Sequence, residues 1–154
     1  MEAAADFAIR PACIEDLPGF LALFRHLIPD DDVLPEAVAR ERFLAVLQHP
    51  GLTVFGAFVD GRPVSSVTLI VVPNLLRGGA SYAMIENVVT HADHRKRGYG
   101  RALLRRATET AWSAGCYKVM VMVGSKDPAT LRFYEESGFA KLKTGFEARR
   151  IPPR

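Results

Sequence analysis

The sequence contains little cysteine and no long apolar run, and both shortages limit what the protein can be. Two cysteines among 154 residues cannot build a disulfide framework, and no CxxC or Cys/His pair has the spacing of a metal site. No apolar stretch approaches the roughly 20 residues that span a bilayer. The N-terminal segment "MEAAADFAIRP" is acidic and lacks the apolar run of a signal peptide. We therefore expect a soluble cytoplasmic protein without a bound metal or a membrane partner.

Positive charge is in small excess and is concentrated in one segment. The 20 Lys and Arg residues outnumber the 17 Asp and Glu residues by only three, although six of the twelve residues 95–106 are cationic and none is acidic. The remainder of the chain is therefore nearly neutral, which favours a local anion site over a surface for nucleic acid. A nucleic-acid-binding domain would also need stacking aromatics or a basic helix face, and Tyr99 alone is thin support for one.

The order of hydrophobic patterns predicts a mixed α/β protein. Apolar residues at 49 % and charged residues at 24 % are typical of a globular protein, and we expect residues 1–154 to form a single domain. Strand–helix–strand order implies parallel pairing, hairpins add antiparallel pairing, and helices should cover both faces of the sheet. The patterns predict strands over 7–12, 52–60, 63–73, 82–90 and 116–123, helices over 13–28, 35–48, 100–114 and 127–138, and one or two strands within 139–151.

Two of these elements carry more detailed expectations. In the helix over 13–28, the spacing of Ile14, Leu17, Leu21, Phe24 and Ile28 predicts a buried stripe. In the helix over 100–114, the corresponding stripe is Leu103, Leu104, Ala107 and Ala111. The nearly all-apolar strand over 116–123 is typical of a central position in a sheet.

Glycines and cations meet at the start of the helix over 100–114, in the segment "RKRGYGRALL". Free N–H groups and the positive end of the helix dipole favour anions there, and Gly98 and Gly100 let the backbone come close to phosphate oxygens. The segment is not a P-loop, because GxxxxGK is absent, nor a dinucleotide fingerprint, because Leu103 stands at the third glycine position. Spacing alone is equally compatible with a tight turn that has a solvated basic face.

Several segments together resemble the GNAT family of N-acetyltransferases. The segment "RKRGYG" is similar to that family's R/Q-x-x-G-x-G/A signature and is followed by the expected "RALL". "IENVVT" resembles the family's fourth strand, residues 115–139 resemble its fifth strand and last helix, and "IRPACIEDLPGFLALF" resembles its N-terminal strand and helix. "GCYK" and "FYEESGF" are similar to glucosamine-phosphate N-acetyltransferases, whereas "VVPNLLRGGASYAMIENVVTH" resembles small bacterial members of undefined substrate.

The resemblance implies a GNAT-like acyl-CoA N-acyltransferase fold, with a central mixed sheet of about six to seven strands flanked by about four helices, and acetyl-CoA as the co-substrate. It implies that the glycine turn holds the pyrophosphate and that the pantetheine arm runs along the fourth strand, where the fourth and fifth strands splay apart. Many relatives contact the pantetheine with an asparagine where this chain has Thr130, and Ser125 could compensate. The implied acetyl-CoA-binding residues are Val88, Val89, Thr90, Arg95, Lys96, Arg97, Gly98, Tyr99, Gly100, Arg101, Ser125 and Thr130.

Two residues are implied to carry the chemistry of acetyl transfer. Tyr134 is similar to the family's tyrosine that donates a proton to the CoA sulfur, and a phenol with a pKa near 10 suits that role. Glu86 stands where family members often carry a base that acts through water, and a strand N–H, that of Val88, would donate to the oxyanion. The competing interpretations are a half-buried core tyrosine and a glutamate that points to the other face and pairs with an arginine.

These residues predict an acetyl-CoA-dependent N-acetyltransferase that acts on a primary amine of a small molecule by direct attack in a ternary complex. The alternative is a non-catalytic acyl-CoA-binding or regulatory module on the same fold. The acceptor pocket would be built from the N-terminal helices and the segment "VVPNLLRGG", and the run Asp30–Asp32 is more simply a solvated loop than part of it. His91 and His94 are expected on the surface, and a homodimer is possible.

Overall fold

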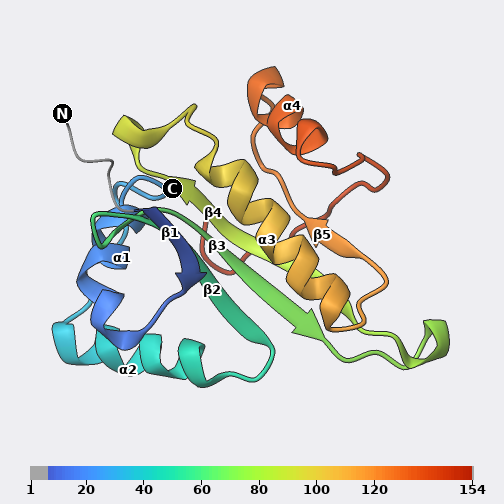
Figure 1. Ribbon diagram of the computed structural model, residues 1–154, viewed down its shortest axis with the longest axis horizontal. Coiled ribbons are helices and arrows are strands. Elements are labelled where there is room, and N and C mark those ends of the chain that lie inside the picture. Colours follow the sequence, from blue (N-terminus) through green and yellow to red (C-terminus); the bar gives the residue numbers. More distant parts are fainter. Residues whose placement is uncertain (1–6, 154) are drawn as a thin grey trace.

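The computed structural model describes residues 7–153, so the acidic residues 1–6, in which we expect no signal peptide, lie outside the described part. Across that part the chain forms one five-stranded sheet in the order β1-β2-β3-β4-β5 (Figure 1). The strands are β1 (Phe7–Pro11), β2 (Leu52–Val59), β3 (Arg62–Val72), β4 (Tyr82–Thr90) and β5 (Val119–Val121). The α-helices are α1 (Leu17–Phe24), α2 (Glu36–Gln48), α3 (Tyr99–Ser113) and α4 (Pro128–Glu136), with short 3-10 turns η1 (Ile14–Asp16), η2 (Arg77–Gly79) and η3 (Ala92–His94).

Antiparallel pairing joins the first four strands, and a helical connection joins the last two. β2 and β3 form a hairpin whose two-residue turn, Asp60–Gly61, has positive φ at both positions, as hairpin turns of this length prefer. β4 continues through η3 and α3 before the chain returns to pair with β4 in parallel as β5. The mixed α/β sheet predicted from the sequence is confirmed.

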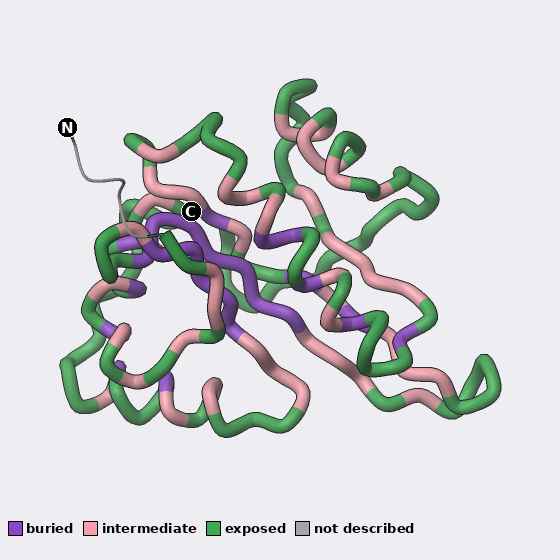
Figure 2. Tube along the Cα trace, viewed as in Figure 1, coloured by how far each residue is buried: buried purple, intermediate pink, exposed green. Residues whose placement is uncertain are grey.

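Helices cover both faces of the sheet, and each face has its own core. On one face α3 buries Leu103, Leu104, Ala107 and Ala111, the predicted stripe, against apolar residues of β2, β3 and β4. On the other face α1 and α2 pack Phe20 and Phe43 against β2. Figure 2 shows that the most continuous buried stretch follows the middle strands, where both layers meet the sheet. Among residues 7–153, no helix is long and apolar enough to cross a membrane.

The strand count and the position of the fifth strand correct the sequence-based expectation. Five strands are present in the described residues instead of about six to seven, because the predicted strands within 139–151 do not form. β5 is only three residues long, half-buried and at the edge of the sheet, whereas a central strand was expected over 116–123. Cys116 is buried before β5 begins, whereas Tyr117 is exposed, so the apolar run does not form one continuous buried strand.

The first helix is shorter than predicted and buries a different face. Residues Ile14–Asp16 form a 3-10 turn, and the α-helix begins only at Leu17, with Pro18 in its first turn. The helix ends at Phe24, so Ile28 lies beyond it, and the buried positions are Leu17, Phe20 and Leu23, while Leu21 and Ile28 are each 43 % exposed. The stripe predicted through Leu21 and Ile28 is therefore wrong.

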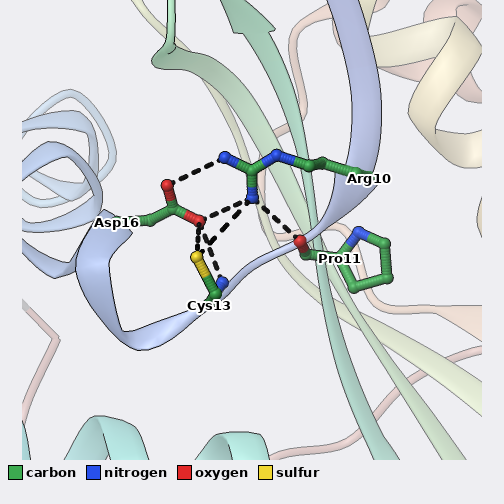
Figure 3. Close-up of polar contacts among 4 residues, drawn as sticks. All are labelled: Arg10, Pro11, Cys13 and Asp16. Atoms are coloured by element: carbon green, nitrogen blue, oxygen red, sulfur yellow. Dashed lines mark hydrogen bonds and ion pairs between the residues drawn. The ribbon is translucent and has the colours of Figure 1, made fainter.

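An ion pair between Arg10 and Asp16 connects the start of this first helical segment to β1. Arg10 in β1 donates two hydrogen bonds to the Asp16 carboxylate, at 2.7 and 3.0 Å (Figure 3). Its guanidinium also lies 3.7 Å from the centre of the Phe58 ring. The Cys13 backbone N–H donates to Asp16 Oδ2 at 2.9 Å, and the Cys13 thiol lies 3.2 Å from the same oxygen. The hydrogen bond from Arg10 lowers the pKa of Asp16 to about 2.

Candidate active site

An extra residue in β4 interrupts its regular pairing with β3 a few residues before the glycine turn. Ser66 pairs with Val89 and Thr68 pairs with Glu86, so Val67 of β3 faces two residues of β4, Asn87 and Val88. Asn87 has φ +53°, a left-handed conformation that asparagine tolerates better than most residues. This β-bulge reverses the alternation of faces: Ile85 packs against the α3 side before it, and Val88 does so after it.

The bulge coincides with the point where β4 loses its partner on one side. Parallel pairing with β5 covers only Ala83–Ile85, opposite Val119–Val121, although β4 continues to Thr90. Within residues 7–153 no strand pairs with this part of β4 on the β5 side. An unpaired strand edge presents backbone N–H and C=O groups to an extended ligand. Of the sequence-predicted residues here, Val89 is buried, Val88 and Thr90 are half-buried and Glu86 is exposed.

The cationic turn follows directly from this edge. After η3 the chain passes through Arg95, Lys96 and Arg97, all exposed, to Gly98, the N-cap of α3. Lys96 and Gly98 have φ of +60° and +84°, so left-handed residues alternate with ordinary ones just before the helix begins. The Arg95 side chain donates to the Thr90 carbonyl at 3.3 Å. The first N–H groups of α3 therefore open beside three cations, an arrangement that attracts a phosphate.

The two glycines of the turn have different structural roles. Nothing lies within 4 Å of the place where a Gly98 side chain would stand, so its conformation is the reason for glycine there. At Gly100 the φ angle is ordinary, but a Cβ would stand 3.2 Å from the Phe133 ring and 3.6 Å from the Thr90 hydroxyl. Gly100 thus lets the start of α3 approach both β4 and α4. Tyr99, the remaining residue of the motif, is half-buried and stacks on Phe7 with ring centres 5.3 Å apart.

Tyr134 and Glu86 come from different elements and lie close enough for their charges to interact. Tyr134 is half-buried on α4 between the rings of Phe133 and Phe139. Burial, and secondarily the carboxylate of Glu86, raises the pKa of Tyr134 above 10. Glu86 takes part in none of the ion pairs formed by the described residues, so the predicted alternative of an arginine partner is not observed.

The remaining predicted residues lie around α4. Asp127 is the N-cap, as predicted, with its carboxylate accepting from the Ala129 N–H at 3.0 Å, and the exposed Ser125 accepts from the Asp127 N–H at 3.1 Å. Thr130 is half-buried in the first turn of α4. Arg101 forms an exposed 2.7 Å ion pair with Glu136, so in this structure it links α3 to α4 instead of standing free at the phosphate turn.

His91 and His94 line a groove next to the cationic turn. About 510 Å³ in volume, the groove is lined by η1, α1, the β2–β3 turn, His91 and His94, but not by Glu86 or Tyr134. Both histidines are half-buried and neither is the simple surface residue that we expected. In Figure 1 helices α1 and α2 lie on one side of the molecule and the tip of the β3–β4 hairpin on the other, and no residue of that tip lines the groove.

Sequence reasoning missed two residues that shape this region. Asn87 forms the bulge, and its signal is an asparagine inside an otherwise apolar strand pattern, where the residue is unfavourable unless the backbone is irregular. His26 comes from the segment after α1, and its Nδ1 accepts a hydrogen bond from the Ala92 N–H at 3.3 Å. No local pattern predicts that contact, because the two residues are 66 positions apart.

Comparison with known proteins agrees with this geometry. Residues 20–139 match the model of the acetyltransferase (GNAT) family. A glucosamine 6-phosphate N-acetyltransferase of Trypanosoma brucei brucei is 40 % identical over 136 residues, which cover 87 % of this chain and 89 % of the relative. A protein of Agrobacterium tumefaciens strain C58, assigned as an acetyltransferase, has a solved structure with a TM-score of 0.90 and 50 % identity, covering 93 % of this chain and 99 % of that one.

A more distant structure shares the fold alone. It is an aminoglycoside N-acetyltransferase in complex with CoA, with a TM-score of 0.80 and 17 % identity, covering 98 % of this chain and 99 % of that one. The family match spans well over half of the chain, and the sheet, the glycine turn and α4 occur in the order that the motif implies. The chain belongs to the acetyltransferase (GNAT) family. Within that family, it is an N-acetyltransferase.

Proposed function

We propose that this enzyme transfers the acetyl group of acetyl-CoA to a primary amine of a small molecule, by direct attack in a ternary complex. The observation that carries the proposal is the continuity of three features: the unpaired edge of β4, the cationic turn at the start of α3, and Tyr134. The edge suits the amides of a pantetheine arm, and the turn suits a pyrophosphate. We assign the 12 implied binding residues to this path, with Arg101 contributing only if its pair with Glu136 opens.

Each chemical step has a candidate group in this chain. Acetyl-CoA supplies a thioester that an amine can attack, and the amine must first lose a proton, because an alkylamine has a pKa near 10. Glu86, exposed on β4, accepts that proton through water. The amine nitrogen forms a bond to the carbonyl carbon while a strand N–H, that of Val88, donates to the oxyanion. The carbon–sulfur bond then breaks, and the departing thiolate takes the proton of the Tyr134 hydroxyl, which a raised pKa keeps in place. The acylated nitrogen gives up its second proton, which passes through water to the Tyr134 phenolate and restores the hydroxyl.

For the acceptor, we propose an amino sugar phosphate of the glucosamine 6-phosphate type. The support is the 40 % identical relative, which is named for acetylation of that compound and covers most of this chain. Aminoglycosides form the second class to test, because the structural neighbours that share the fold include enzymes named for them. The relevant experiment measures release of CoA thiol with glucosamine 6-phosphate, glucosamine, aminoglycosides, polyamines and amino acids.

Two results would contradict parts of this proposal. If a large excess of acetyl-CoA does not raise the melting temperature, acyl-CoA binding itself is wrong. If acetyl-CoA stabilises the protein but no amine is acetylated over a broad panel, the alternative of a non-catalytic acyl-CoA-binding or regulatory module replaces the enzyme in this chain. Turnover with amines other than sugars would retain the reaction and reject only the acceptor class.

The role of Glu86 has its own test. Glu86→Gln should lower turnover near pH 7 by about 10- to 100-fold while leaving acetyl-CoA affinity nearly unchanged, because the amide cannot accept the proton. Glu109→Gln is the matched control, since Glu109 is an exposed carboxylate on α3 whose ion pair within residues 7–153 is with Arg105. Equal turnover by the Glu86 variant and the control would assign the base to water or to another group.

A further inference from the structure

Three of the four histidines gather beside the start of the cationic turn, and we call His26, His91 and His94 the histidine cluster. The His26 and His91 rings are 4.0 Å apart and inclined by 42°, and the His94 ring lies 5.5 Å beyond, edge-on to His91. His94 in turn lies 6.1 Å from Tyr99, the first residue of α3. The cluster therefore connects the segment after α1 to η3, which precedes the cationic turn, and to Tyr99, which follows it.

Two hydrogen bonds in the cluster require uncharged imidazoles. His26 Nδ1 accepts from the Ala92 backbone N–H at 3.3 Å, and His91 Nδ1 accepts from the Asp93 backbone N–H at 3.1 Å. A backbone N–H can only donate, so each Nδ1 must carry a lone pair and no proton. An imidazolium has a proton on both nitrogens and cannot accept either bond. Protonation would also place two positive rings 4.0 Å apart.

We propose that His26 and His91 are positioning residues for the acyl-CoA phosphate turn, and that their protonation releases η3 and weakens acyl-CoA binding. The bonds they accept hold Ala92 and Asp93, the first two residues of η3, and η3 leads within one residue to Arg95. Because each ring accepts a backbone N–H bond only in its neutral form, the turn is held while the imidazoles are uncharged and loosened when they gain protons. The affinity part of the proposal rests on the proposed function, whereas the effect on η3 does not.

Charged groups of both signs lie around the cluster. The Asp93 carboxylate is 4.0 Å from His91 Nδ1, and it is 86 % exposed and therefore well screened. The cations Arg95, Lys96 and Arg97 follow His94 directly in the chain. The other charged groups that share the walls of the groove or of the adjoining hollow with His91 or His94 are Glu15, Asp16, Asp60 and Arg62.

The first test uses the protein without ligand. Hydrogen exchange of the Ala92 and Asp93 amides is measured from pH 5 to 8 and corrected for intrinsic exchange. In the wild type we expect protection of both amides to fall by about fivefold to tenfold as the pH is lowered over this range and the imidazoles gain protons, the loss of one hydrogen bond each. In the double variant His26→Asn and His91→Asn, the side-chain oxygen replaces Nδ1 as an acceptor that does not titrate, so protection should stay constant.

The second test measures the dissociation constant of CoA by calorimetry over the same pH range. Wild-type affinity should fall by about tenfold between pH 7.5 and 5.5, and the double variant should lose clearly less. His49→Asn is the matched control, because His49 Nδ1 accepts the same kind of bond from the Gly51 N–H at 3.1 Å but lies after α2. This control should retain the wild-type pH dependence.

The outcomes separate the inference from the proposed function. Amide protection that does not depend on pH, or that falls equally in the wild type and the double variant, overturns the inference whether or not CoA binds. The same holds for an affinity profile identical in both proteins. A pH step in protection that the double variant abolishes, in a protein that binds no CoA, supports the positioning of η3 and rejects only the proposed ligand.

Discussion

The Tyr134 hydroxyl is surrounded by groups that keep its proton in place. Burial between the rings of Phe133 and Phe139 disfavours the phenolate, and the Glu86 carboxylate adds to that effect, so the pKa of Tyr134 lies above 10. A general acid works only in its protonated form, and a raised pKa extends that form to more alkaline solution. This argues for a proton donor to a departing thiolate, not for a nucleophile.

Replacing this hydroxyl should slow the chemistry more than binding. We expect Tyr134→Phe to lower turnover by about 100-fold with little change in the dissociation constant of acetyl-CoA, since phenylalanine retains the ring contacts. Wild-type activity should also persist to a more alkaline pH than an ordinary tyrosine would allow, because burial and Glu86 raise the pKa of Tyr134. Steady-state rates from pH 7 to 10.5 measure both effects. Tyr117→Phe, on the exposed segment before β5, is the control; an equal loss in that variant would contradict the assignment.

Asp16 makes stability depend on pH in the acid range. Its pKa is about 2 in the folded protein and 3.8 otherwise, so its pair with Arg10 stabilises the fold above about pH 4 and progressively less as the pH falls toward 2. We expect Asp16→Asn to lower the free energy of unfolding at pH 7 by about 1–2 kcal/mol, an amount reduced by the partial exposure of Arg10.

Urea unfolding at pH 7, 4 and 2.5 tests this expectation. The difference between the wild type and Asp16→Asn should be largest at pH 7 and should narrow at pH 2.5. Glu41→Gln provides the control, because the Glu41–Arg42 pair is 71 % exposed on both sides and 3.7 Å long. A constant difference at all three pH values would show that Asp16 acts through packing or hydrogen bonding alone.

At the level of single residues, predictions succeeded where the chemistry is encoded locally. Asp127 is the N-cap of α4 as its sequence neighbours indicated, because a cap depends on the next two residues. The histidine cluster could not be predicted, since it depends on how the segment after α1 folds back onto η3. The assigned roles of Glu86, Tyr134 and the 12 binding residues stay predictions until they are measured.

At the scale of the elements, the start of α3 depends on two glycines, Gly98 and Gly100. Gly98 has φ +84° in open space, whereas Gly100 has an ordinary φ and closes against Phe133. A substitution at Gly98 therefore tests backbone conformation and one at Gly100 tests packing. The two positions differ in cause although both belong to the same motif.

We expect Gly98→Ala to destabilise the fold by about 1 kcal/mol, and Gly98→Asn by less, because asparagine tolerates the left-handed region. Gly100→Ala should cost a similar amount through its contact with Phe133, and the double change Gly100→Ala with Phe133→Leu should recover part of that loss. Thermal unfolding of the four variants provides the measurement. Equal losses for alanine and asparagine at position 98 would mean that the side chain, and not φ, causes the effect.

Proline and glycine residues at the helix ends made the long helices predictable. The segment 116–123 has no such residue inside it, which explains why its strand was predicted too long. α2, α3 and α4 begin or end within about two residues of the expected positions, where Pro35, Gly115 and Gly138 stand. The apolar run over 116–123 contains no such signal, and a buried strand cannot be told from a buried loop by hydrophobicity alone. Likewise, residues 139–151 have strand-like composition but do not pair with the sheet.

For the molecule as a whole, the exposed apolar side chains near the C-terminus favour association with a second copy. Leu142, Phe146 and Ile151 are 85, 92 and 61 % exposed, and Met122, just after the edge strand β5, is 53 % exposed. Apolar groups of this size are usually covered. The homodimer stays a prediction, as do the single domain over residues 1–154 and the cytoplasmic location.

Light scattering coupled to size exclusion tests the association. We expect a dimer of the 17.0 kDa chain at micromolar concentration, and a shift toward monomer in the double variant Leu142→Ser and Phe146→Ser. Leu75→Ser and Leu76→Ser together serve as the control, because these residues are equally exposed but lie at the β3–β4 hairpin tip. A monomeric wild type at every concentration would contradict the prediction.

The bulge at Asn87 also determines which changes in chain length the gene can tolerate. It adds one residue to β4 opposite a single residue of β3, and that residue determines which face Val88 and Thr90 present to α3. Removing one codon there would change composition very little but would turn every later side chain of the strand to the opposite face. A scan of single-codon deletions should therefore find residues 86–90 intolerant, whereas the exposed hairpin tip near Leu75 should accept deletions. In residues 86–90 the number of residues therefore matters more to the fold than the identity of each side chain.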